Sequence, residues 1–279
     1  MKRFLNKIII ASLCIVLLLS GSGYDRKGRA YAATIPTGGE DFAFEGLRYR
    51  LTDDGSKTIA VVTGIDKDGK VLKDSIVIPS KVTFEDEQYS VRRIAAAAFA
   101  YSDIIEAEIS EGVERIEASA FTGCSLLKRI TFPASLDSIG TGVFSYCRAL
   151  ENIEIADFNE VFIYENGMLF GSGYEYLFWA SQSVKSRVSV PEGTVRIMAY
   201  AFEGNSKIKK VILPAGLKRI DKGAFFDCPS LTSADIPATV TAMDGNPFMY
   251  CPSLTKIRVA SQNEAYCTSK SGLQIGRAH

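Results

Sequence analysis

The stretch GAFFDCPSLTSADIP, residues 223–237, contains an Ala-Phe pair, a cysteine, a leucine, an isoleucine and a proline at fixed intervals. Closely related spacings occur in TGVFSYCRALENIEIA from Thr141, in AYAFEGNSKIKKVILP from Ala199 and in NPFMYCPSLTKIRVA from Asn246. Stretches that share one pattern indicate an internal repeat, and a repeat decides the whole architecture of a chain.

The phenylalanines give the period of the repeat. Successive reference phenylalanines lie 22, 23, 58, 23 and 23 positions apart. A proline stands 11 positions before each of the last four reference phenylalanines, so a second landmark has the same period and phase. A period of this length is typical of stacked supersecondary units. The reference residues are Phe99, Phe121, Phe144, Phe202, Phe225 and Phe248, and the prolines are Pro133, Pro191, Pro214 and Pro237.

Each unit predicts one coil of a solenoid. Leu231, Ala234 and Ile236 match the opening L-x-x-L-x-L of a leucine-rich repeat, whose last three residues form a short strand. Because side chains alternate along a strand, Ala234 and Ile236 are expected to point inward, and Ser233 and Asp235 outward. No coil can bury its apolar side alone, so equivalent residues should stack into one continuous core.

The units AFTGCSLLKRITFPASLDSIG and AFFDCPSLTSADIPATVTAM resemble the BspA-like, Treponema-type leucine-rich repeats of bacterial surface proteins. The resemblance covers about residues 91–259, with Ser102 and Asn205 in place of the recurrent cysteine in two units. It implies a mainly β, right-handed leucine-rich-repeat solenoid of ~23-residue coils, with a β-hairpin cap and one β-hairpin insertion. It also implies an adhesin-like bacterial surface protein.

The N-terminus predicts export. Three basic residues precede an apolar run from Ile8 to Leu19, and Ala30-Tyr31-Ala32 is a small-x-small cleavage site. We therefore expect residues 1–32 to be a signal peptide cut after Ala32, with a cut nearer Ser22 as the alternative. Its removal takes away six Lys/Arg and one Asp, which leaves 26 positive and 31 negative charges, a net charge of −5. This balance argues against nucleic-acid binding, and we expect a secreted or cell-surface protein with no stable membrane span after cleavage.

The remaining chain divides into five predicted segments. Residues 33–90 form an N-terminal β-hairpin cap, with turns at Asp54-Gly55 and Asp68-Gly69 and a protruding tip at FEDEQY. Residues 91–156 and 191–260 are two repeat blocks, and residues 157–190 are a β-hairpin insertion that turns at Asn166-Gly167. Residues 261–279 repeat the start of the insertion, since Asn263-Glu264 matches Asn159-Glu160. They either leave the core poorly covered or belong to a longer protein.

Candidate chemistry is sparse. The only histidine is His279, which removes the usual Ser-His and Cys-His nucleophiles and most histidine metal sites, so we predict no enzyme, no cofactor and no metal. The segment DKDGK at 66–70 is interpreted as a hairpin turn instead of a calcium loop. Cys124 and Cys147 are 23 residues apart, as are Cys228 and Cys251. Each pair is either a disulfide or, as we favour, two free thiols in a buried ladder.

The outward strand positions form the candidate binding surface, because repeat proteins bind through an extended strand face. We expect a binding module for an extracellular protein, such as a host matrix or cell-surface protein, or for another surface protein. The alternatives are a structural spacer in a longer surface protein, and glycan binding by an exposed aromatic patch at Tyr174, Tyr176 and Trp179, whose other interpretation is that they fill the junction between repeat blocks. The candidate face residues are Arg129, Thr131, Asn152, Glu154, Lys210, Ile212, Ser233, Asp235, Lys256 and Arg258.

Overall fold

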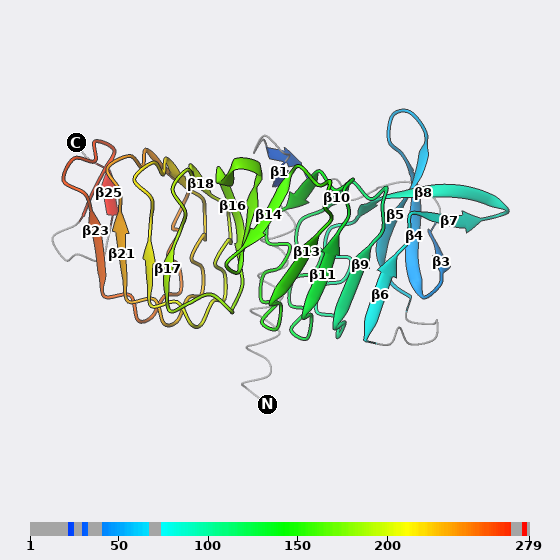
Figure 1. The fold of residues 1–279 in the computed structure, drawn as a ribbon, viewed down its shortest axis with the longest axis horizontal. Coiled ribbons are helices and arrows are strands. Elements are labelled where there is room, and N and C mark those ends of the chain that lie inside the picture. The colour runs from blue at the N-terminus through cyan, green and yellow to red at the C-terminus, as the bar shows by residue number, and fades with distance from the viewer. Residues whose placement is uncertain (1–21, 25–29, 33–40, 67–73, 269–274, 278–279) are drawn as a thin grey trace.

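The computed structural model describes residues 22–24, 30–32, 41–66, 74–268 and 275–277. They form an elongated β-solenoid whose coils stack along the long axis of the molecule (Figure 1). Within these ranges the one helical element is the short 3-10 turn η1 (Ser172–Tyr174). The expected mainly β repeat solenoid is therefore confirmed.

Coils contribute one strand each to a front sheet, and the strands of neighbouring coils run parallel. Two such sheets follow one another along the molecule. The first front sheet consists of β6 (Ser75–Ile78), β9 (Glu106–Ile109), β11 (Arg129–Phe132) and β13 (Asn152–Ile155). The second front sheet consists of β17 (Arg187–Ser189), β19 (Lys210–Ile212), β21 (Ser233–Ile236) and β23 (Lys256–Val259).

Shorter strands form the opposite side of the coils. In the first half these are β10 (Arg115–Ile116) and β12 (Ser138–Gly140), and in the second half β18 (Arg196–Ile197), β20 (Arg219–Ile220) and β22 (Ala242–Met243). The hairpin of β1 (Ser22–Tyr24) and β2 (Ala30–Ala32) adds antiparallel to the edge of β12. Cleavage after Ala32 would remove both of these strands.

The N-terminal cap is built from hairpins, as the turn signals predict. β3 (Asp41–Phe44), β4 (Leu47–Asp53) and β5 (Thr58–Ile65) pair antiparallel, and the Asp54 carboxylate accepts the Ser56 and Lys57 amides at the tip between β4 and β5. β7 (Lys81–Phe84) and β8 (Glu87–Ile94) form the protruding FEDEQY hairpin (Figure 1). The Asp68-Gly69 turn and most of the DKDGK segment lie outside the described residues.

The insertion is a three-stranded antiparallel unit of β14 (Phe162–Glu165), β15 (Met168–Gly171) and β16 (Tyr176–Ala180). The predicted turn has left-handed backbone at Asn166 and Gly167, with φ of 52° and 75°. β16 then pairs parallel with β18, so the hairpin continues the stack instead of leaving it.

The inserted hairpin separates two hydrophobic cores, and its side chains pack into both of them. Leu169 and Trp179 are cross-strand partners and belong to the core of the first half. Phe170, the next residue of β15, pairs with Leu177, two residues before Trp179 in β16, and both belong to the core of the second half. A register shift between Leu169 and Phe170 accommodates Phe178 as an extra residue, so a bulge re-aims the strand between the two cores.

The reference phenylalanines stack as the period predicts. Ring centroids lie 5.1 Å apart for Phe99 and Phe121, and 4.9 Å apart for Phe202 and Phe225. The 58-residue gap interrupts the column after Phe144, where Trp179 packs edge-on with its centroid 5.5 Å away. The aromatic spine of the first half therefore ends on the insertion.

Cys124, Cys147, Cys228 and Cys251 are free thiols, as we expected, and they form a regular pattern. The Cys124 and Cys147 thiols donate to the carbonyl oxygens of Phe99 and Phe121, each with an Sγ to O distance of 3.0 Å. The thiols of Cys228 and Cys251 donate in the same way to Phe202 and Phe225. Each thiol thus satisfies a buried carbonyl in the preceding coil, which a plain hydrophobe cannot do.

Two asparagines confirm that the insertion and the C-terminal segment share one local plan. The Asn159 side-chain amide donates to the carbonyls of Pro133 and Leu136, and its oxygen accepts the amides of Val161 and Phe162. Asn263 makes the equivalent four bonds to Pro237, Val240, Ala265 and Tyr266, and the hairpin of β24 (Tyr266–Thr268) and β25 (Ile275–Arg277) follows it.

Candidate binding face

The alternation of each front strand fixes which side chains reach solvent. In β11, Ile130 and Phe132 are buried, while Arg129 and Thr131 lie on the outer side. The parallel register then places equivalent residues of neighbouring coils side by side, as with Asp235 and Arg258. All ten candidate face residues therefore point outward, four on the first front sheet and six on the second.

Charged side chains on the first front sheet form a cross-strand ladder. The Arg129 guanidinium lies between two carboxylates, 3.0 Å from Glu106 and 3.2 Å from Glu154. The Asn152 amide also donates to Glu154, over 3.2 Å. The three ionic side chains are each about half exposed, so solvent screens both pairs and they contribute little to folding.

The second front sheet has the inverse arrangement, with one acid between two bases. Asp235 lies 3.0 Å from the Lys210 ammonium and accepts two bonds from the Arg258 guanidinium, at 2.5 and 3.0 Å. The hydrogen bonds from Arg258, with a further contribution from Lys210, lower the pKa of the Asp235 carboxyl to about 2. Asp235 therefore stays ionised throughout the physiological range.

The two halves of the face have opposite charge. On the outward strand positions of the first front sheet, three glutamates stand against one arginine, a net charge of −2. On those of the second, four bases stand against one aspartate, a net charge of +3. The contributing residues are Glu106, Glu108, Glu154 and Arg129 in the first set, and Arg187, Lys210, Lys256, Arg258 and Asp235 in the second.

An open groove of about 730 Å³ crosses the carboxyl ends of the second front sheet. Its lining is mostly apolar, and Asp235, Arg258 and Glu192 supply its charged groups. Pro237 lies where the β21 strand ends, so the residues after the strand turn away and leave apolar side chains accessible between coils. The apolar side chains in the lining include Leu213, Ile236, Pro237 and Val259.

The aromatic residues proposed as an alternative site do not form one exposed patch. Trp179 is only 6% exposed and packs on Phe144, so the exposed-patch alternative is wrong for this residue and the junction-filling interpretation is confirmed for it. Tyr174 packs on Phe170 and donates its hydroxyl to Glu165, and Tyr176 is half-buried in β16. The hairpin places Trp179 inward because its cross-strand partner Leu169 already faces the first core.

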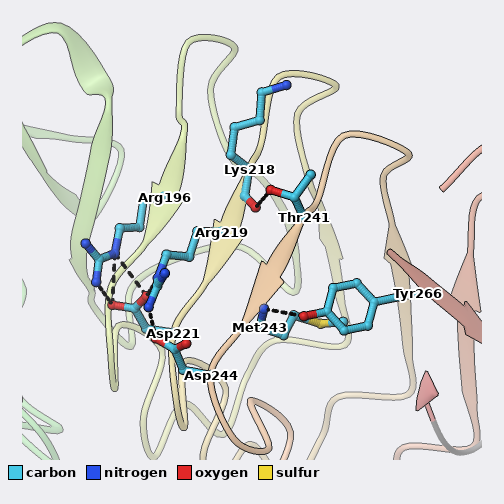
Figure 2. A network of polar contacts seen from close by, with 8 residues as sticks. All are labelled: Arg196, Lys218, Arg219, Asp221, Thr241, Met243, Asp244 and Tyr266. Carbon is cyan, nitrogen blue, oxygen red and sulfur yellow. Dashed lines mark hydrogen bonds and ion pairs between the residues drawn. The ribbon is translucent and has the colours of Figure 1, made fainter. Parts of the chain in front are cut away.

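The opposite side of the second half carries a polar network that the repeat pattern did not reveal (Figure 2). Asp221 is 2% exposed and accepts hydrogen bonds from the guanidinium groups of Arg196 and Arg219, at 2.9 to 3.1 Å. Arg219 also pairs with Asp244 in the next coil. Because the buried carboxylate is compensated by Arg219 of its own coil and by Arg196 of the preceding coil, this network links neighbouring coils.

A known family of sequence repeats matches this chain. A BspA type leucine rich repeat region, in six copies, matches residues 75–168 and 174–271. The chain belongs to this family. No curated protein matches the chain. In the described residues, no group of three or more His, Cys, Asp or Glu side chains is placed to hold a metal ion, and no helix has the length and hydropathy needed to span a bilayer.

Two solved structures share the fold. A leucine rich cell surface protein from Faecalibacterium prausnitzii is 21% identical with a TM-score of 0.50, over 85% of this chain and 58% of that protein. A leucine-rich repeat protein from Eubacterium ventriosum is 17% identical with a TM-score of 0.51, over 85% of this chain and 78% of that protein. The chain thus spans less than two thirds of the first relative, and likeness at these identities concerns the fold alone.

Proposed function

We propose that this BspA-type chain is an exported bacterial binding module, adhesin-like in character, which holds an extracellular protein against its front face. The observation that carries the proposal is the front face itself, where outward side chains line two sheets of parallel strands and, on the second sheet, adjoin an open apolar groove. Exposed residues on rigid strands make a preorganised surface, which limits the entropy lost on binding.

Export and surface placement belong to the same proposal. The basic residues, apolar run and small-x-small site within residues 1–32 support secretion. The similar protein from Faecalibacterium prausnitzii is described as a cell surface protein. A binding module of this kind acts outside the cell, so we propose a secreted or cell-surface location and a non-enzymatic role.

The test is a binding screen of the exported chain against extracellular matrix proteins and glycans. The same screen is run with a variant in which Lys210, Asp235 and Arg258 are all changed to alanine. These side chains are exposed or half-buried, so the variant should keep its melting temperature and lose its partner. A Lys218→Ala/Lys222→Ala variant, altered away from the front face, is the matched control.

Each outcome assigns a role. Loss of a partner in the front-face variant, with binding retained in the control, supports the proposal. A partner that binds both variants equally lies elsewhere on the molecule and contradicts it. If the chain binds nothing in the panel, the result favours the structural-spacer alternative, and the binding-module proposal fails for these ligand classes.

A further inference from the structure

We propose that the second front sheet and its groove bind an extended acidic segment of a partner protein, with apolar side chains of that segment seated in the groove. The inference rests on the proposed function and deepens it, because it assigns the partner's chemistry and the half of the face that holds it. Three features carry it: the groove, the charge of the second front sheet and the opposite charge of the first.

The groove supplies the apolar contacts. Leu213 and Val259 are partly exposed at its surface, and Ala215 and Ala238 add only methyl groups between them. A space of about 730 Å³ is large enough for a few side chains, and its open form admits a chain from the side. Burying apolar side chains of a partner here would remove apolar surface from water, which favours binding.

The charge around the groove selects an acidic partner. Asp235 is compensated by both Lys210 and Arg258, so two bases already share one acid. Arg187 and Lys256 are exposed on the outer strands of the same sheet and extend the positive surface on either side. A basic segment would meet a net charge of like sign, whereas an acidic segment is attracted and oriented.

The first front sheet confines the same partner to one half. Its net charge of −2 repels an acidic segment, which therefore gains from lying over β17, β19, β21 and β23 only. These strands are spaced about 4.8 Å apart, so a segment of about six extended residues crosses all four. Such a segment passes over the groove at the carboxyl ends of the strands.

An acidic protein segment fits these features better than a sulfated glycan. Both offer negative charge, but only the protein segment brings aliphatic side chains for Leu213, Pro237 and Val259. Glu192 at the groove also disfavours a uniformly anionic ligand, because it would face a negative group without compensation. The two ligand classes therefore differ in their need for the groove.

The test uses a fluorescein-labelled peptide with a central Leu-Val-Leu flanked by three glutamates on each side, titrated with the exported chain. Comparison peptides carry lysine flanks or a Ser-Gly-Ser centre, and a heparin-derived hexasaccharide competes in a separate titration. Two single variants of the exported chain are titrated in the same way. The first is Lys256→Glu. The second is Ala215→Trp, which fills the groove from an exposed position without removing core contacts. Lys218→Glu, away from the front face, and Ala134→Trp, at the position of the first half equivalent to Ala215, are the matched controls.

We expect the glutamate-flanked peptide to bind, and its affinity to fall as salt is raised from about 50 mM to about 300 mM. Lys256→Glu and Ala215→Trp should each weaken it by about tenfold, while the two control variants change it less than about twofold. The proposal is overturned if no binding occurs at about 1 mM chain. It is also overturned if the lysine-flanked peptide binds as well, or if Ala215→Trp has no effect.

Two further outcomes separate this inference from the proposed function. If the hexasaccharide displaces the peptide, and the peptide with the Ser-Gly-Ser centre binds as tightly as the one with Leu-Val-Leu, charge alone is recognised and the protein-segment assignment is wrong. If a partner from the binding screen depends on the Lys210/Asp235/Arg258 triplet but ignores Lys256→Glu and Ala215→Trp, the front face binds and the acidic-segment inference fails. Loss of all binding to the face refutes both.

Discussion

A buried carboxyl at the junction of the two halves should make stability depend on pH. Glu203 follows the reference residue Phe202, is 5% exposed, and its Oε2 atom has no hydrogen-bond partner. Burial raises its pKa from 4.5 to about 8, opposed by the nearby polar side chains of Ser145 and Tyr146 and supported by the charge of Asp227. The side chain is therefore protonated at neutral pH in the folded protein and ionised in the unfolded chain.

The sign and size of the effect follow from this difference. Below pH 4.5 both states are protonated, and the contribution of Glu203 is fully present. As pH rises to about 8 the unfolded state loses its proton first, so the free energy of unfolding falls through this window. At about 1.36 kcal/mol per pH unit, the loss reaches about 5 kcal/mol. Asp227 adds to the loss, because burial raises the pKa of its carboxyl too.

The assay is urea unfolding of the chain and of Glu203→Gln at about pH 5 and about pH 9. Glutamine keeps the shape and cannot ionise, so the variant should be more stable than the parent at the higher pH by about 3 to 5 kcal/mol, and nearly equal at the lower. Glu154→Gln, on the exposed face, serves as the control and should follow the parent. Parallel pH dependence of parent and Glu203→Gln would refute the assignment of the effect to this carboxyl.

Three further measurements test the coil assignments. Phe225→Ala should lower the free energy of unfolding in urea by about 3 to 5 kcal/mol, and Asp235→Ala by less than about 1 kcal/mol; equal losses would contradict the Phe column. Asn159→Ala removes four hydrogen bonds and should lower the free energy of unfolding by about 2 to 4 kcal/mol. Asn152→Ala should change it only slightly in the same urea unfolding experiment. Thiol titration of the unfolded exported chain without reductant should find the described cysteines free, and a count of one free thiol would establish disulfides.

The repeat was predictable because its constraint is local and periodic. A residue such as Phe225 faces its equivalents one period away, so one sequence offset encodes both its burial and its neighbours. The Ala-Phe steps, the front strands and the outward face residues follow from that offset. The hairpin turn at Asn166-Gly167 was predictable for a related reason, since the left-handed turn favours those two residues whatever surrounds them.

Other features were hidden because they depend on contacts between dissimilar segments. Which aromatic residues of the insertion are buried depends on the bulge at Phe178, which has no sequence signature of its own. Glu203 approaches Ser145 only because the inserted hairpin lets the two halves stack across the long gap. Arg196 and Arg219 are one period apart, but the position of Asp221 is Met198 in the preceding coil, so the period alone does not predict their network.

The inserted hairpin links packing to the charge pattern of the face. It continues the core through β15 and β16, whose side chains enter both cores, while the front strands on either side belong to separate sheets. A continuous front sheet would bring the acidic first half and the basic second half into direct ladder contact, where opposite charges neutralise one another across strands. With the hairpin between them, β13 and β17 are not paired in the described structure, and each front sheet keeps its own net charge. The same element that lets the stack continue therefore preserves the positive half on which selective binding of an acidic segment would depend.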